Sequence, residues 1–107
     1  MLTEALLAHV ERRLRLILTQ FGQRIKQVAV RLTELHAQHR GLDKQCKVKA
    51  TLFPSGNVMV TAVDPNLHTA IDRAADRLER SVTRELERRR RMQKGMRRAS
   101  ATRRERP

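Results

Sequence analysis

Arginine residues recur near the end of the sequence at the spacing of one helix face. Six of them are separated by four, three, four, four and three positions: Arg73, Arg77, Arg80, Arg84, Arg88 and Arg91. We call this row the arginine ridge. Guanidinium groups bind phosphate bidentately, so such a row can follow a nucleic-acid backbone. A solvated charged face is the alternative, but Asp72, Asp76 and Glu79 occupy other angular positions, which favours phosphate binding.

A second group of cations is expected on a β-sheet. Arg31, Lys47 and Lys49 take outward positions of two predicted strands, facing away from the predicted helices. A basic sheet face without aromatic residues suits contacts to phosphates and to RNA shape rather than base stacking. A plain solvated face explains these positions equally well.

Residues that could carry catalysis do not form a recognisable site. The sequence has no nucleophile elbow, no Gly-rich phosphate loop and no carboxylate pair on a strand face. His36, His39 and Cys46 could supply three zinc ligands, but a closed site needs four and the spacing of His68 does not favour it as the fourth. His68 and Asp72 are typical of a surface pair on a helix. We therefore expect no enzyme, no metal site, no cofactor and no small-molecule substrate.

The charge of the chain is concentrated at its end. The 107 residues carry a net charge of +13, and residues 88–107 hold ten basic residues and one acid. Such asymmetry indicates a polyanionic partner, either nucleic acid or an anionic membrane. Met92 and Met96 are the only sizeable apolar residues of this segment, which disfavours a membrane. Nucleic acid is the expected partner.

Composition also limits the compartment in which the protein is expected and the way in which it can bind nucleic acid. One cysteine excludes an internal disulfide and fits a reducing compartment. No secretory signal is visible, and the longest charge-free stretch, residues 50–63, is too short to cross a bilayer. Phe21 and Phe53 are the only aromatic residues besides histidine, which leaves few platforms for base stacking. We expect a cytoplasmic protein without membrane contact.

The first half of the chain predicts a helix followed by a strand. Thr3 is a good N-cap, and Gly22 stands where a helix stop is expected. Between them, five apolar residues form one helical stripe: Leu6, Val10, Leu14, Ile17 and Phe21. Residues 27–33 then alternate as in a half-buried strand. Residues 36–44 are polar and are predicted to form a loop.

The second half predicts two strands and a long helix. Cys46, Val48, Ala50 and Leu52 alternate with polar residues, and the turn at residues 54–57 leads into a strand at residues 58–63. Asp64-Pro65 predicts a helix start. The helical stripe continues to Leu86, and the helix is expected to fray between Arg91 and Gly95.

These elements predict a two-layer α+β domain in the order helix, three antiparallel strands, helix. The domain is expected to cover residues 1–91. Residues 92–107 are expected to form a basic, disordered tail.

The order of these motifs resembles a known family. Thr3-Glu4-Ala5-Leu6 opens a helix, and Ile25-x-x-Val28-x-Val30-x-Leu32 and Cys46-Lys47-Val48-x-Ala50-Thr51-Leu52 follow. With the helix sequence of residues 67–80, they resemble the ribosome hibernation-promoting factors, also called ribosome-associated inhibitor, protein Y or sigma-54 modulation proteins. The resemblance covers residues 2–91.

The resemblance implies a stress-response regulator of translation that binds the small ribosomal subunit and the 70S ribosome. In the family, the protein occupies the channel of mRNA and of the A- and P-site tRNAs and contacts small-subunit rRNA phosphates. On matching positions this implies a role for Arg77, Arg80, Arg84 and Arg88, and more loosely for four other cations: Arg24, Lys26, Lys47 and Lys49.

Three features depart from the family. Its members begin with a strand before this helix, and no such strand precedes Thr3. Either the start of the sequence was placed too late, or a sheet edge is left unpaired and can serve for self-association. His68 stands where the family often has Tyr. The long members carry a C-terminal dimerisation domain, whereas this chain has an Arg-rich tail, so ribosome dimerisation by such a domain is not expected.

Two other functions fit the same residues. A generic double-stranded-RNA-binding module shares the order helix, three strands, helix, but its Gly-rich approach to a Lys-Lys helix is replaced here by Asp64-Pro65-Asn66-Leu67. An interaction protein that docks another protein through its edge strand or tail is the third class.

Overall fold

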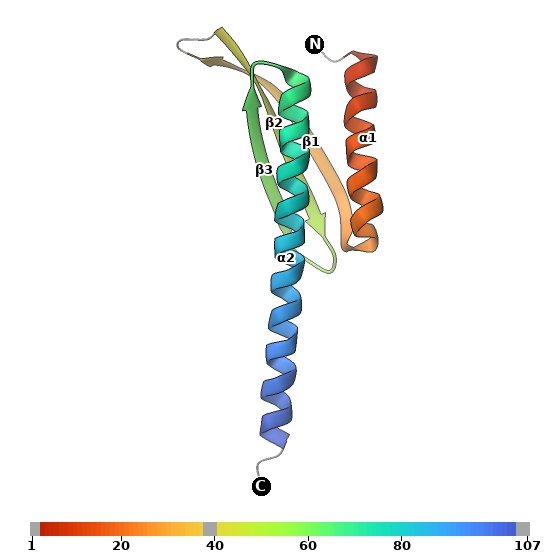
Figure 1. Ribbon diagram of the computed structural model, residues 1–107, viewed down its shortest axis with the longest axis vertical. Helices are drawn as coiled ribbons and strands as arrows, with labels where there is room; N and C mark the ends of the chain where they lie inside the picture. Colours follow the sequence, from red (N-terminus) through yellow and green to blue (C-terminus); the bar gives the residue numbers. More distant parts are fainter. Residues whose placement is uncertain (1–2, 38–40, 105–107) are drawn as a thin grey trace.

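The protein is a two-layer α+β domain with one long projecting helix (Figure 1). The computed structural model describes residues 3–37 and 41–104. Their elements are α1 (Glu4–Phe21), the 3-10 turn η1 (Gly22–Arg24), β1 (Ile25–Ala37), β2 (Gly41–Leu52), β3 (Asn57–Asp64) and α2 (Leu67–Arg104). The predicted fold class and element order are confirmed.

Helix α1 begins and ends where its sequence predicts. The Thr3 hydroxyl accepts a hydrogen bond from the Leu6 backbone N–H at 3.2 Å, which satisfies one free donor of the first turn. Gly22 has a φ of 57°, and its N–H donates to the carbonyl of Leu18. Glycine adopts this left-handed conformation without strain, so the chain turns here towards β1.

The three strands form an antiparallel meander in the order β1-β2-β3. In β2, Cys46, Val48, Ala50 and Leu52 are buried against the helices, whereas the intervening Lys47 and Lys49 are exposed. This confirms the predicted alternation of that strand. The sheet therefore has one apolar inner face and one basic outer face.

The hairpin between β1 and β2 is longer than predicted. Residues 36 and 37 belong to β1 and residues 41–44 to β2, so most of the predicted loop at 36–44 is strand, and residues 38–40 lie outside the described residues. Glu34 lies opposite Lys44 in the register, and their side chains form an ion pair at 2.6 Å. Such cross-strand pairs stabilise a polar extension of the hairpin that hydrophobic alternation does not reveal.

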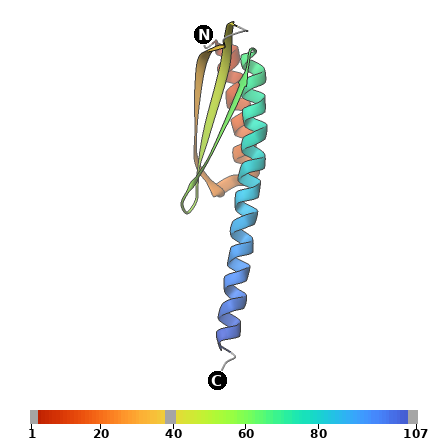
Figure 2. The ribbon, with the colours of Figure 1, turned by 90° about the vertical axis from the view of Figure 1, so that its left-hand side faces the viewer.

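Both helices pack on the same side of the sheet (Figure 2). The fully buried side chains of α2 come from its first five turns: Ala70, Ala74, Leu78 and Val82. Leu6 and Ile17 contribute from α1. The two helices are also joined by polar contacts, because His9 Nε2 lies 2.7 Å from Asp72 Oδ1 and Arg13 Nη2 donates to Asp76 Oδ1 at 2.6 Å.

The start of α2 differs from the prediction by two residues. Asp64 ends β3, and its carboxylate accepts a hydrogen bond from the Asn66 N–H at 2.9 Å. The Asn66 side chain in turn accepts from the Thr69 N–H at 3.2 Å, which is the geometry of an N-cap. Asn66 therefore caps the helix, and Asp64 instead orders the turn before it.

The end of α2 differs more. The helix does not fray between Arg91 and Gly95 but continues to Arg104, so residues 92–104 are helical rather than disordered. This stretch has no proline and consists largely of good helix formers, while the single Gly95 costs only about 1 kcal/mol relative to alanine. The helix projects well beyond the sheet (Figure 1), and the molecule measures 69 × 30 × 16 Å.

The two edges of the sheet differ. The edge of β3 lies beside α2, where Arg77 donates to the carbonyl of Thr61. Strand β1 pairs only with β2 among the described residues, so its other edge carries no partner strand there. The self-association expected from this open edge stays a prediction. No helix in the described part of the chain is both long and apolar enough to cross a membrane.

Candidate nucleic-acid interface

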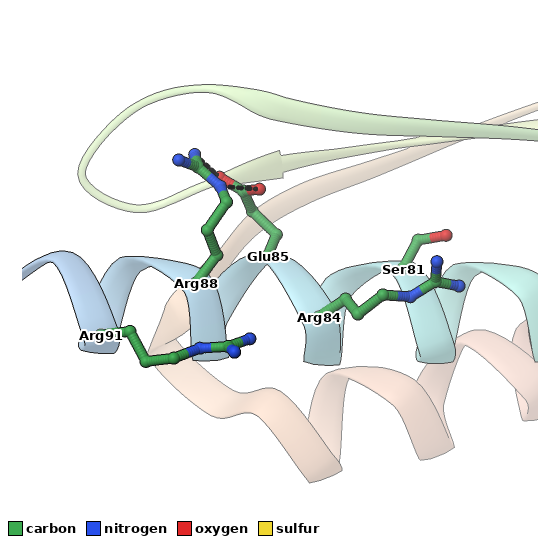
Figure 3. Close-up of a pocket in the computed structure, with 5 residues that line it drawn as sticks. All are labelled: Ser81, Arg84, Glu85, Arg88 and Arg91. Carbon is green, nitrogen blue, oxygen red and sulfur yellow. Dashed lines mark hydrogen bonds and ion pairs between the residues drawn. The ribbon is translucent and has the colours of Figure 1, made fainter.

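The arginine ridge is an exposed stripe along α2. All six of its residues are exposed, whereas the opposite side of the helix supplies the core. At its C-terminal end the ridge borders a shallow groove lined by Ser81, Arg84, Glu85, Arg88 and Arg91 (Figure 3). The predicted spacing therefore does place these guanidinium groups together on one face.

The first three arginines of the ridge are in contact with protein groups. Arg73 Nη1 lies 3.5 Å from Asp64 Oδ2, and Arg77 donates to the Thr61 carbonyl. Arg80 Nε lies 3.4 Å from the carbonyl of Asp76, one turn earlier in the same helix. Each guanidinium has five N–H donors, so donors remain available for a ligand on all three.

Arg88 is held by a carboxylate. Its Nε and Nη2 atoms donate to the two oxygens of Glu85 at 3.1 and 2.6 Å (Figure 3). The same carboxylate accepts from Arg89 Nε at 3.1 Å. Hydrogen bonds from Arg88 and Arg89 lower the pKa of Glu85 to about 2. Glu85 thus stays ionised at neutral pH and offsets part of the charge of Arg88.

Arg84 and Arg91 differ from their neighbours. Within the described residues, neither guanidinium has an ion-pair or hydrogen-bond partner (Figure 3). Both are exposed and both line the groove. These two cations are the most available phosphate ligands of the ridge.

A second basic surface lies on the outer face of the sheet, away from the helices. Arg31 and Lys47 are register partners on β1 and β2, and Lys49 lies two residues further along β2. With Ala29, Val30 and Met59 they line a shallow depression. None of the three cations has a side-chain partner among the residues that the structure describes. We call Arg31, Lys47 and Lys49 the outer-face cations.

Thr61 lies where these two surfaces approach each other. It is the register partner of Lys47 on β3, and its carbonyl accepts from Arg77 of the ridge. The row Arg31, Lys47, Thr61 therefore leads across the sheet to the helix at the β3 edge. Neighbouring strands lie about 4.8 Å apart, so this path is short.

Arg24 and Lys26 form a third group at the end of the sheet that carries the β2–β3 turn. Lys26 Nζ donates to the Pro54 carbonyl at 3.3 Å and lies 5.6 Å from the centre of the Phe53 ring. Arg24 borders a shallow depression with Phe21, Thr83 and Arg90. The structure thus distributes the predicted RNA-binding residues over three places instead of one patch.

Two residues at this end of the sheet are not among the RNA-binding residues predicted from the sequence. Arg89 donates to the Ser55 carbonyl at 2.8 Å and so ties the β2–β3 turn to α2. Phe53 is 55% exposed in that turn. The Pro-Ser-Gly-Asn sequence identifies the turn, but no local pattern shows which helix residue reaches it.

The histidines and the cysteine do not assemble into a metal site. Cys46 is buried in the core, where burial raises the pKa of its thiol to about 11, and His36 is exposed at the end of β1. His39 lies outside the described residues. His68 packs against His9, with ring centres 5.0 Å apart. No group of three or more potential ligands converges within residues 3–37 and 41–104.

Comparisons with known proteins agree with this fold. The family model described as Sigma 54 modulation protein / S30EA ribosomal protein matches residues 1–90. Among solved structures, the chain is similar to the crystal structure of the Thermus thermophilus Protein Y N-terminal domain. That match has a TM-score of 0.56 and 29% identity, and it covers 77% of this chain and 83% of that one. No curated protein matches.

Proposed function

Because the chain belongs to the Sigma 54 modulation protein / S30EA ribosomal protein family, we propose that it is a ribosome hibernation factor that inhibits translation. In this proposal the protein binds small-subunit rRNA, both in the free small subunit and in the 70S ribosome. Its site lies within the channel that mRNA and the A- and P-site tRNAs occupy. It acts in the cytoplasm as a binding protein and catalyses no reaction.

One observation carries the proposal. The arginine ridge presents six exposed guanidinium groups on one face of a rigid helix, and Arg84 and Arg91 lack protein partners among the described residues. Phosphates are the ligands that such an array matches in charge and geometry. The outer-face cations and the pair Arg24 and Lys26 extend the same chemistry to other sides of the domain.

The shape of the molecule adds support. A body only 16 Å thick suits a narrow space between RNA elements, and its positive charge favours a site lined by phosphates. The basic helix that continues to Arg104 extends this charge away from the sheet.

Co-sedimentation tests the proposal. Purified protein is mixed with small subunits, large subunits or 70S ribosomes and then centrifuged, with and without mRNA and tRNA. We expect one copy per small subunit and per 70S ribosome, little binding to large subunits, and release by mRNA plus tRNA. Equal binding to both subunits, or no competition, would refute a site in the decoding channel.

A generic double-stranded-RNA-binding module remains the second candidate, because the element order helix, three strands, helix fits it too. Titration with a plain RNA duplex separates the two. Binding to the duplex as tight as binding to the small subunit would favour this second candidate, whereas much weaker duplex binding favours the ribosomal site.

A further inference from the structure

Phe53 is an exposed aromatic ring in a chain that has almost none. The sequence contains no Trp, no Tyr and two Phe residues, and Phe21 packs against the core while Phe53 is 55% exposed. Leu52 directly before it is completely buried. The ring thus stands outside the apolar core, and core packing does not account for it.

The turn that carries Phe53 is held in place on several sides. The Phe53 N–H donates to the Arg24 carbonyl at 2.8 Å, and the Leu52 N–H donates to the Gly56 carbonyl at 2.9 Å. Arg89 fixes the turn to α2 through the Ser55 carbonyl. Gly56 has a φ of +88°, a backbone conformation that residues with a side chain rarely adopt, so glycine suits this position of the turn. The ring is therefore presented on a rigid support.

The surroundings of the ring are basic. Lys26 Nζ lies over the ring, 5.6 Å from its centre, and Lys49 and Lys47 lie earlier along the strand that leads to Phe53. The Arg89 guanidinium donates to the Ser55 carbonyl of the turn. A nucleic-acid backbone held by these cations would bring its bases within reach of the exposed ring.

We propose that Phe53 is a base-stacking contact for an unpaired nucleotide of the bound RNA. Every base presents a flat π-face, so one rigid ring beside phosphate-binding cations is enough for one stacking contact. The inference rests on the proposed function, since it needs RNA at this surface. It adds a contact to a base, whereas the arginine ridge contacts only phosphates.

The absence of tryptophan from the sequence makes a direct test available. In Phe53→Trp, the new indole is the only tryptophan, and its fluorescence reports contact with a base. Titration with single-stranded oligoadenylate is expected to quench the emission by about half or more, while a fully paired RNA duplex of equal charge leaves it nearly unchanged. Leu16→Trp, at a 65% exposed position on α1 and outside the basic surfaces, is the matched control and is expected to show little quenching.

Affinity provides a second readout. Phe53→Ala and Phe53→Leu are both expected to weaken oligoadenylate binding by about 5- to 100-fold, and Phe53→Trp is expected to retain it. Leu16→Ala is expected to change it less than about twofold. Melting temperatures of all variants serve as a check that the domain stays folded.

The results separate this inference from the proposed function. If the indole of Phe53→Trp is not quenched and Phe53→Ala binds oligoadenylate like the unmodified protein, the stacking contact is refuted, while normal binding to small subunits leaves the proposed function standing. If Phe53→Ala loses only subunit binding, the ring contacts a ribosomal protein and the stacking proposal is also refuted. If the unmodified protein binds neither RNA nor subunits, both proposals fail.

Discussion

The arginine ridge and the outer-face cations are two basic surfaces of different construction. Four ridge arginines, Arg73, Arg77, Arg80 and Arg88, already contact groups of the protein. The three outer-face cations have no such partners within the described part of the chain. Formal charge is therefore not the same as charge available to a ligand, and the two surfaces must be compared by their free donors.

The two surfaces also differ in the type of cation they offer. The free positions of the ridge are arginines, which bind phosphate with two parallel hydrogen bonds, whereas two of the three outer-face cations are lysines, which act as point charges. We therefore expect the ridge to contribute more affinity per residue, although each cation on either surface releases counterions equally.

Removing the two free ridge cations should have the largest effect. Arg84→Gln combined with Arg91→Gln is expected to weaken binding to small subunits by about 30-fold, taking about 1 kcal/mol for each charged contact. The slope of log K against log salt should become shallower by about 2. Fluorescence anisotropy over a series of salt concentrations measures both quantities.

Arg12→Gln combined with Arg15→Gln is the matched control. Both residues are exposed on α1, and neither has a partner among the described residues. The control removes the same charge but leaves the ridge intact, so its affinity should fall by only about twofold. Equal losses for the two double variants would mean that net charge, and not the ridge, drives binding.

The outer-face pair should have a smaller effect. Lys47→Gln combined with Lys49→Gln is expected to weaken binding by about tenfold, yet to reduce the salt slope by the same amount of about 2, because the slope counts charges and not hydrogen bonds. The same anisotropy titration applies. A greater loss for this pair than for Arg84 and Arg91 would reverse the proposed ranking of the two surfaces.

Arg77 should influence stability more than binding. Arg77→Gln removes the hydrogen bond to the Thr61 carbonyl, and we expect a loss of about 1 kcal/mol in the free energy of unfolding, or about 4–8 °C in Tm. Arg80→Gln is the control, since Arg80 contacts only its own helix, and its Tm should stay nearly unchanged. Thermal denaturation followed by circular dichroism measures both, and equal Tm values would contradict a structural role for Arg77.

Replacing Glu85 should produce the smallest change in affinity for small subunits. Glu85→Gln removes the carboxylate that holds Arg88, so binding to small subunits should strengthen by about two- to fivefold at pH 7. Unchanged or weaker binding of this variant in the anisotropy titration would show that Arg88 does not contact RNA.

The pH dependence of stability tests the same ion pairs. The pKa of Glu85 is lowered to about 2, so its pairs with Arg88 and Arg89 stabilise the fold fully above about pH 4.5 and lose this effect as the pH falls towards 2. Denaturant unfolding between pH 5 and 2 should show a steeper loss of stability for the unmodified protein than for Glu85→Gln, and parallel curves would contradict the lowered pKa.

Local sequence patterns predicted the parts of the fold that depend on local chemistry. Thr3 and Gly22 cap α1 as expected, Cys46 to Leu52 alternate as expected, and the ridge lies on one helix face. The family resemblance is also confirmed by the match over residues 1–90. These features need only backbone geometry and the period of hydrophobic residues.

The remaining features depend on contacts between distant residues. The β1–β2 hairpin extends past residue 36 because partners such as Glu34 and Lys44 meet across strands. The contacts of Arg77 with Thr61 and of Arg89 with Ser55 join residues 16 and 34 positions apart. Such pairings decide which cations are free and which support the fold, and neither spacing nor composition encodes them directly.

The central claim is that the domain binds small-subunit rRNA through several simultaneous phosphate contacts. Its most direct test is the affinity of the unmodified protein for purified small ribosomal subunits over a series of salt concentrations. If about six phosphates are neutralised, log K plotted against log salt should have a slope of about −4 to −5. A slope near about −1 would contradict the claim, because so few released counterions correspond to a single phosphate contact.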